Sequence, residues 1–350
     1  MVRRLTFAVP GDLATPTGGY AYDRRMIAEL EHLGWHIDLV DLGEGFPWPS
    51  HETRSAVRAR LLAVPAGRAI VIDGLAFGVL PEAALQLRSR HPLIALVHHP
   101  LAMESGLSAG QSNLLRASEC AALAATSHIV VTSAATARYL VADYGVPAEH
   151  ISVAPPGTDP APMAQGSQDG IVRLLSVGAV VPRKGFDVLI AALASLIDLP
   201  WHLAIAGDRS RDPEAAARVD ADIKRYNLGN RVAVHGAVSP ERLGELYAGA
   251  DLFVLASRFE GYGMAYAEAV AHGLPIIGTN AGAIPDTVPA EVGVLVAPDE
   301  PDARARALRK VIENPDERRR MGTSARAAAS RLPTWQESAK IFARAIEVLA

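Results

Sequence analysis

The chain has 350 residues, which is more than a single hydrophobic core usually holds, so length alone predicts two domains. A hydrophobic fraction of 49% with 21% charged residues is typical of a folded globular protein and excludes a disordered chain. The formal net charge is only −4 and the basic residues are dispersed, which argues against nucleic acid as a partner.

Cys120 is the only cysteine, so the chain cannot form an intrachain disulfide or a thiolate-rich metal site. The N-terminal apolar run is too short for a signal sequence, and no later stretch approaches the roughly 18 apolar residues of a membrane span. We therefore expect a cytoplasmic protein without a membrane span.

In the first half of the chain, short apolar runs that end in turn residues alternate with helix-like segments, which predicts a parallel sheet covered by helices. The runs are LTFAVPG, HIDLVDLG, AIVIDGL, LIALVHHP, HIVVTSAAT and ISVAPPG. Residues 160–170 are rich in Pro, Gly and small polar residues and are interpreted as a linker. We place the first domain at residues 1–162.

The pattern restarts after the linker, and we place a second α/β domain at residues 170–333. Its expected strands are RLLSVG, WHLAIAGD, RVAVHGAV, DLFVLAS and LPIIGTN. A last helix-like segment covers residues 334–350, and the pattern alone leaves open on which domain it packs. Two such sheets predict an interdomain cleft that faces the carboxyl ends of their strands, where open α/β sheets bind ligands.

Gly18 and Gly19 come just before an expected helix, where glycine lets the backbone approach a ligand closely. Taken alone, such a pair more often belongs to a plain loop. It lacks the G-x-G-x-x-G spacing of a dinucleotide fold, so NAD binding is not expected.

His98 and His99 end the apolar strand LIALV, at the edge of the first sheet that should face the cleft. A histidine at such a place either contacts a ligand or is simply hydrogen-bonded. Because no Cys, Asp or third His lies at ligand spacing in the sequence, we rank ligand contact above a metal site. Asp220 and Asp222 form a D-x-D string, but they fall in a charged helical stretch and are interpreted as a solvated face.

Arg183 and Lys184 lie in an expected loop between a strand that ends at Gly178 and a helix that opens near Phe186. Two cations beside a helix start favour phosphate, although loop cations are often only solvated. The loop is not a Walker A motif, because Arg183 and Gly185 stand where that motif needs Gly and Ser or Thr. An ATPase is therefore not expected.

In SRFEGYGMAYAEAVAHGLP, an apolar strand runs through a glycine-bearing turn into an Ala-rich helix, and Glu260 and Glu268 flank the helix start. The unpaired N–H groups of that start, near Gly263 and Met264, suit a phosphate. A sugar nucleotide fits this pattern because it carries hydroxyls on both sides of a diphosphate. The alternative is that Glu260 only caps the turn and Glu268 is a solvated helix residue.

These motifs together resemble family 4 of the retaining GT-B glycosyltransferases over nearly the whole chain. The resemblance implies two Rossmann-like domains, a final helix that crosses back to the N-terminal domain, and a donor nucleotide held mainly by the C-terminal domain. It implies no obligatory metal and no other cofactor. It is carried by TGGY, LVHHP, SHIVVTSAATARYL, ISVAPPGTD, VGAVVPRKGFDVLIAAL, LAIAGD, VHGAVS, ADLFVLASRFEGYGMAYAEAVAHGLPIIGTNAGAIPD and VGVLVAPDE.

By this resemblance, Arg183 and Lys184 neutralise the donor diphosphate, Glu268 accepts hydrogen bonds from the ribose diol, and Glu260 meets hydroxyls of the transferred sugar. His98 would lie beside the sugar and acceptor, and the segment around residues 235–238 would border the base. The further donor contacts expected on this basis are Gly18, Gly19, Gly178, His235, Val238, Gly263 and Met264.

The expected activity is front-face transfer of a hexose from a UDP- or GDP-hexose, in which the departing phosphate takes the acceptor's proton. A sugar-nucleotide epimerase or hydrolase and a non-catalytic nucleotide-sugar sensor are the alternatives. The acceptor, a small molecule, glycan or lipid, is not identified, and peripheral membrane contact stays open. His99 stands where the family often has Asp, so which histidine faces the sugar is also open.

Overall fold

The computed structural model describes residues 3–349 and divides into two compact units. The first unit comprises Met1–Gly157 and Pro333–Ala350, and the second comprises Thr158–Leu332. The chain therefore enters the second unit directly after Gly157, whereas the sequence pattern placed a separate linker at residues 160–170. Each unit has a six-stranded parallel sheet, which confirms the α/β class with two Rossmann-like domains.

The sheet of the first unit has the strand order β2-β1-β3-β4-β5-β6, and all six predicted strands are present. The central strands β3 and β4 are buried along their whole length, because AIVID and LIALV are almost entirely apolar and helices cover both faces. The strands are β1 (Arg3–Val9), β2 (Trp35–Asp41), β3 (Ala69–Asp73), β4 (Leu93–Val97), β5 (His128–Val131) and β6 (Ile151–Val153).

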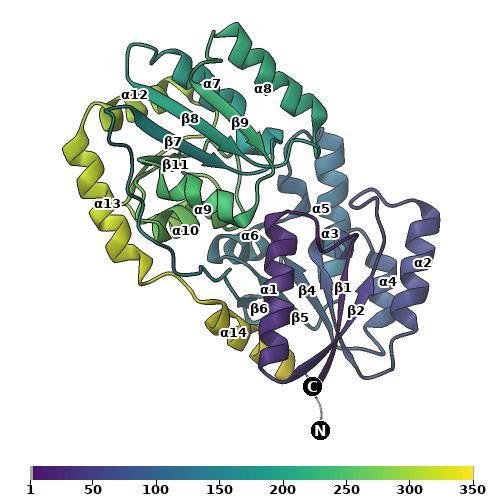
Figure 1. Ribbon diagram of the computed structural model, residues 1–350. Coiled ribbons are helices and arrows are strands. Elements are labelled where there is room, and N and C mark those ends of the chain that lie inside the picture. The colour runs from purple at the N-terminus through teal and green to yellow at the C-terminus, as the bar shows by residue number, and fades with distance from the viewer. Residues whose placement is uncertain (1–2, 350) are drawn as a thin grey trace. The chain divides into compact units, whose positions relative to one another are not determined.

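Helices lie between successive strands along the chain, as the crossover connections of a parallel sheet require (Figure 1). The helices of the first unit are α1 (Gly18–His32), α2 (His51–Leu62), α3 (Gly74–Phe77), α4 (Pro81–Leu87), α5 (Ala109–Leu123), α6 (Ala134–Tyr144) and α14 (Trp335–Glu347). Short 3-10 turns cover Leu101–Met103 (η1) and Ala148–His150 (η2).

Helix α14 packs on the first unit, against α1, β5 and β6. Thr334 and Glu337 form a capping box at its start, and its apolar stripe includes the buried Trp335 and Phe342. Gly157 permits the approach, because a Cβ at that position would lie 2.2 Å from the backbone nitrogen of Trp335.

The sheet of the second unit has the order β12-β11-β10-β7-β8-β9. Its strands are β7 (Val172–Val177), β8 (Trp201–Ala206), β9 (Val232–Gly236), β10 (Leu252–Val254), β11 (Ile276–Thr279) and β12 (Gly293–Val296). Its helices are α7 (Phe186–Ala194), α8 (Pro213–Arg225), α9 (Pro240–Ala248), α10 (Met264–Ala271), α11 (Ile284–Thr287), α12 (Pro301–Ile312) and α13 (Pro315–Ala329), with a 3-10 turn, η3, at Pro182–Lys184.

The segment interpreted as a linker has no helix or strand, but it is bonded along the second unit. The Ala164 amide donates to the His272 carbonyl at 2.9 Å, and the Gln165 amide donates to the Ala248 carbonyl at 2.8 Å. Its Pro and Gly residues thus mark an irregular path over a folded surface rather than a free connection.

No helix among residues 3–349 is both long enough and apolar enough to span a membrane.

Candidate active site

Two loops at the carboxyl edge of the second sheet carry most of the predicted chemistry. Strand β7 leads into η3 and then α7, and strand β10 leads through residues 255–263 into α10. Because β7 and β10 are paired neighbours in the sheet, their loops emerge side by side. The topology therefore brings together side chains about 76 positions apart in sequence.

Glu260 is the centre of this loop pair and is only 6% exposed. Its Oε1 accepts a hydrogen bond from Lys184 Nζ at 2.7 Å and from Ser257 Oγ at 2.5 Å, and its Oε2 accepts from Arg183 Nη1 at 3.3 Å. Burial works to raise the pKa of this carboxyl, but the two cations and Ser257 outweigh burial and lower it to about 2. Glu260 is consequently a fixed carboxylate at neutral pH, and it does more than cap a turn.

Close backbone contacts hold the two loops in register. Gly185 has φ +65°, and a Cβ there would lie 2.1 Å from the Ala256 carbonyl oxygen. Gly282 also has a positive φ, and a Cβ there would lie 2.3 Å from the Glu260 carbonyl oxygen. These glycines allow the main chain to pack where a side chain would separate the cations from Glu260.

Arg258 links the same loops from the outside. Its amide donates to the Arg183 carbonyl at 2.7 Å, and its guanidinium pairs with Asp187 on α7 and with Asp299 beyond β12, both at 2.7 Å. Sequence reasoning did not single out Arg258, because its partners come from two other segments.

Glu268 lies in α10, where its side chain is half-buried rather than solvated. Tyr247 Oη donates to Glu268 Oε2 at 2.9 Å, and the Tyr247 ring stacks on His272 with 4.7 Å between ring centroids. Burial raises the pKa of Glu268, and the Tyr247 hydrogen bond opposes that rise. Tyr247 was missed in the sequence because it comes from α9 and has no local motif.

Helix α10 begins where the sequence predicted. Gly263 is its N-cap residue with φ +93°, and no side chain caps this end of the helix. Gly263 is buried and Met264, the first helical residue, is half-buried. Backbone N–H groups of an uncapped first turn are suited to an anion.

The other predicted donor residues are less closely connected to Glu260. Gly178 lies under the Lys184 stem, because a Cβ there would be 3.0 Å from Lys184 Cε. His235 is exposed near the end of β9, and Val238 is half-buried in the following loop.

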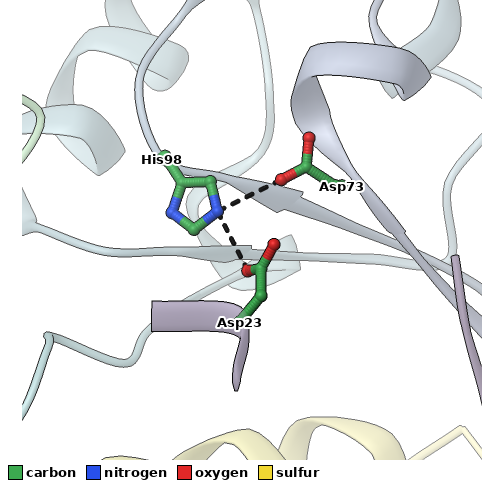
Figure 2. A group of neighbouring side chains, drawn as sticks. All are labelled: Asp23, Asp73 and His98. Atoms are coloured by element: carbon green, nitrogen blue, oxygen red, sulfur yellow. Dashed lines mark hydrogen bonds and ion pairs between the residues drawn. The ribbon is translucent and has the colours of Figure 1, made fainter. Parts of the chain in front are cut away.

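The first unit contains a second polar cluster, shown in Figure 2. His98 Nε2 lies 3.1 Å from Asp23 Oδ1 and 3.2 Å from Asp73 Oδ2. Asp23 is fully buried and Asp73 is 2% exposed. The sequence shows no aspartate at ligand spacing from His98, but the fold places two beside it. Asp73 ends β3 next to β4, so its position at a neighbouring strand end was a usable signal, whereas Asp23 is in the middle of the α1 sequence.

Gly18 and Gly19 are the first residues of α1 rather than a loop before it, and the Thr17 side chain caps the helix. A Cβ at Gly19 would lie 3.4 Å from His98 Cδ2, so this glycine lets α1 approach the imidazole. His99 lies apart from the cluster, with Nε2 at 3.4 Å from Glu104 Oε2.

Asp220 lies on the exposed face of α8 and pairs with Arg209, as its interpretation as a solvated helix residue required.

Comparison with known proteins identifies the family and the fold of this chain. The model of glycosyltransferase family 4 matches residues 45–162, and that of the group 1 glycosyl transferases matches residues 163–328. The chain belongs to the family 4 type of glycosyltransferases, and its fold is the GT-B fold.

Among curated relatives, an MMP α-(1→4)-mannosyltransferase of Mycolicibacterium hassiacum is 28% identical, with 87% of this chain and 77% of that protein aligned. A D-inositol 3-phosphate glycosyltransferase of Xylanimonas cellulosilytica is 31% identical, with 62% of this chain and 56% of that protein aligned. Among solved structures, sucrose-phosphate synthase from Thermosynechococcus elongatus covers 99% of both chains with a TM-score of 0.82 and 22% identity. Anabaena HepE with UDP and glucose covers 97% of this chain and 99% of its own, with a TM-score of 0.78 and 19% identity.

Proposed function

We propose that this glycosyltransferase moves a hexose from a nucleoside diphosphate hexose to an acceptor hydroxyl with retention of configuration. The observation that carries the proposal is the cluster of buried Glu260 with Arg183 and Lys184, beside the uncapped start of α10. Two cations and a row of backbone N–H groups can bind a diphosphate, and a carboxylate that stays ionised can accept hydrogen bonds from sugar hydroxyls.

Each group in the second unit has a role in this proposal. Arg183 and Lys184 neutralise the diphosphate, together with the N–H groups at Gly263 and Met264. Glu260 accepts hydrogen bonds from hydroxyls of the hexose, and Glu268 accepts them from the ribose diol. Gly178 makes room for the Lys184 stem, and the base lies along His235 and Val238. In the first unit, Gly18, Gly19 and His98 serve the sugar and the acceptor.

Transfer breaks the bond between the anomeric carbon and the phosphate oxygen and forms the bond to the acceptor oxygen on the same face of the sugar. The departing phosphate oxygen takes the acceptor's proton, and Arg183 and Lys184 stabilise the charge that develops on it. We include no metal, since these cations supply the positive charge. We place the reaction in the cytoplasm, which suits a chain whose one cysteine is a free thiol.

The cations beside Glu260 favour transfer over hydrolysis by a carboxylate pair. In such hydrolysis, two carboxyl groups flank one glycosidic bond. Here Arg183 and Lys184 lie against Glu260, and these cations provide for the diphosphate of a nucleotide sugar.

The names of similar proteins support a hexose donor. One curated relative is a mannosyltransferase, and structural neighbours contain UDP with glucose or UDP-glucose. We therefore propose a UDP- or GDP-hexose as the donor and leave the acceptor undefined.

The test is a thermal-shift panel of UDP, GDP, ADP and NAD, with the hexose conjugates of the three nucleoside diphosphates. Ligand at about 100 times its dissociation constant should stabilise the folded protein by about 2.7 kcal/mol. We expect a shift with UDP or GDP that Glu268→Ala abolishes and that Glu214→Ala, an exposed carboxylate on α8, retains. No shift with any nucleoside diphosphate, or a shift with NAD alone, would refute the proposal. Donor turnover without transfer to any acceptor would favour the hydrolase alternative.

A further inference from the structure

His98 receives two carboxylates at one ring nitrogen, and this arrangement decides which chemistry the imidazole can perform. The three side chains come from α1, the end of β3 and the end of β4, so the fold rather than a local motif assembles them. Leu75 donates its amide to Asp73 Oδ1 at 2.8 Å, which fixes that carboxylate as the N-cap of α3 and turns Oδ2 toward His98. Asp23 Oδ2 is buried without a hydrogen-bond partner in the described part of the chain.

We propose that Asp23 and Asp73 are positioning residues that lock His98 as a hydrogen-bond donor through Nδ1, so that it binds a sugar hydroxyl oxygen and does not act as a base. This inference rests on the proposed glycosyl transfer. In it, His98 of the first unit binds the sugar, while the departing phosphate takes the acceptor's proton.

The hydrogen-bond chemistry of the cluster requires a proton on Nε2. Nε2 lies 3.1 Å from Asp23 and 3.2 Å from Asp73, and a carboxylate at either place accepts its N–H. Burial raises the pKa of Asp23 to about 7, although His98 opposes that rise. Burial works to lower the pKa of His98, but the two carboxylates outweigh it and raise the pKa to about 10. Both ring nitrogens therefore carry protons at neutral pH, and neither can take a proton from an acceptor.

The groups around the ring lie on its Nε2 side, and Nδ1 lies on the opposite side. Gly19 covers the other edge of the ring, since a Cβ there would lie 3.4 Å from Cδ2 and 3.6 Å from Nε2. Tyr22 packs edge-on with 5.3 Å between the ring centroids, and the Thr132 hydroxyl, just after β5, donates to the His98 carbonyl at 3.0 Å. Figure 2 shows the second ring nitrogen turned away from both carboxylates, and the His98 side chain keeps 18% exposure.

The same three side chains could instead hold a divalent metal, because one ligand atom of each lies within 4.8 Å of the others. The two alternatives make opposite predictions about Nε2. A bound metal would displace the proton that Nε2 shares with the carboxylates, whereas His98 as a hydrogen-bond donor retains it. The experiment below separates them.

The first arm of the experiment measures protonation directly and needs no substrate. Nitrogen NMR spectra of the full chain labelled at histidine are recorded from about pH 6 to about pH 9, with His98 assigned by its loss in His98→Asn. We expect both His98 nitrogens to stay protonated across this range. In Asp23→Asn and Asp73→Asn, which keep side-chain shape, Nδ1 should lose its proton within the range. Glu119→Gln, equally buried in the same unit, should leave His98 unchanged.

A neutral His98 at pH 7 in the wild type would overturn the proposal. So would stoichiometric Zn²⁺ binding that shifts the Nε2 signal and is lost in Asp23→Asn.

The second arm measures transfer. His98→Asn keeps a donor near the Nδ1 position and should retain about tenfold more turnover than His98→Leu. Asp23→Asn should lose turnover as pH rises, with the midpoint found by NMR, while the wild type does not. Equal turnover of the two His98 variants would refute the donor role. If the wild type transfers no hexose at all, the proposed function fails, and the NMR arm still reports on His98.

Discussion

Three carboxyl groups of this protein have different protonation chemistry because their partners differ. Glu260 faces two cations and has a pKa lowered to about 2 against the effect of burial. Glu268 receives one phenol hydroxyl, and its pKa is raised by burial. Burial raises the pKa of Glu119 on α5 to about 8, and hydrogen bonds from the Leu101 amide, at 2.9 Å, and from Tyr144 oppose that rise. Partner charge, rather than depth, therefore determines which carboxyl remains ionised.

Glu119 gives a prediction about stability and pH. Its pKa is higher in the folded chain than the ordinary 4.5, so its contribution to stability is complete below about pH 4.5 and is lost as pH rises to about 8. Between these pH values, the free energy of unfolding should fall by up to about 1.4 kcal/mol per pH unit. Glu119→Gln, which cannot ionise, should remove this loss and be more stable than wild type above pH 8. Urea unfolding at several pH values tests this, and parallel curves for the two proteins would contradict it.

Tyr247 gives a prediction about donor affinity. Tyr247→Phe removes the hydroxyl that orients Glu268 and leaves the stacking on His272 in place. A hydrogen bond to a charged group contributes about 1.5–3 kcal/mol, so nucleotide affinity should fall about tenfold or more. Calorimetric titration measures this, with Tyr226→Phe as the control, because the Tyr226 hydroxyl makes no hydrogen bond within residues 3–349 and its ring contacts Arg225. Equal affinities of the two variants would contradict the positioning of Glu268.

At the scale of elements, the turn from η3 to α7 places the cations and is sensitive to a single methyl group. Gly185→Ala places an alanine at φ +65°, where a side chain strains the backbone, and its Cβ would lie 2.1 Å from the Ala256 carbonyl oxygen. Because the turn must shift to relieve this clash, Lys184 should move away from Glu260. Gly170→Ala is the matched control, since it has φ +79° in the same unit and nothing within 4 Å of its Cβ. We expect Gly185→Ala to reduce kcat/KM at least about tenfold more than Gly170→Ala, because misplacement of about 1 Å costs much of the rate. Similar steady-state kinetics of both variants would show that the turn does not set the geometry.

The sequence was informative about elements because apolar runs such as AIVID and LIALV have few alternatives to a buried parallel strand. It was also informative about residues adjacent to a strand end, such as Arg183, Lys184, Glu260 and His98. It did not reveal Asp23 or Tyr247, since each reaches its partner from the middle or end of a separate helix. Such contacts depend on how helices lie on the sheet, which periodicity does not encode.

At the scale of the whole molecule, the chain returns to its first unit. We therefore expect the last helix and the first strands to unfold together. Phe342 of α14 is fully buried and stacks against Phe7 of β1, with 6.4 Å between ring centroids. Phe342→Ala should cost about 3–5 kcal/mol in that core, while Val348→Ala, at an 86% exposed position of the same segment, should cost little.

Because the second unit has its own core over β7, β10 and β11, this cost should stay within the first unit. Hydrogen exchange read by segment should show faster exchange in β1 and β4 of Phe342→Ala and unchanged exchange in β7 and β10. Nucleotide binding, which we assign to the second unit, should persist in this variant. Faster exchange in all four strands would instead mean that the two units unfold as one cooperative block, and then a tail mutation would reduce donor binding without touching any residue of the donor site.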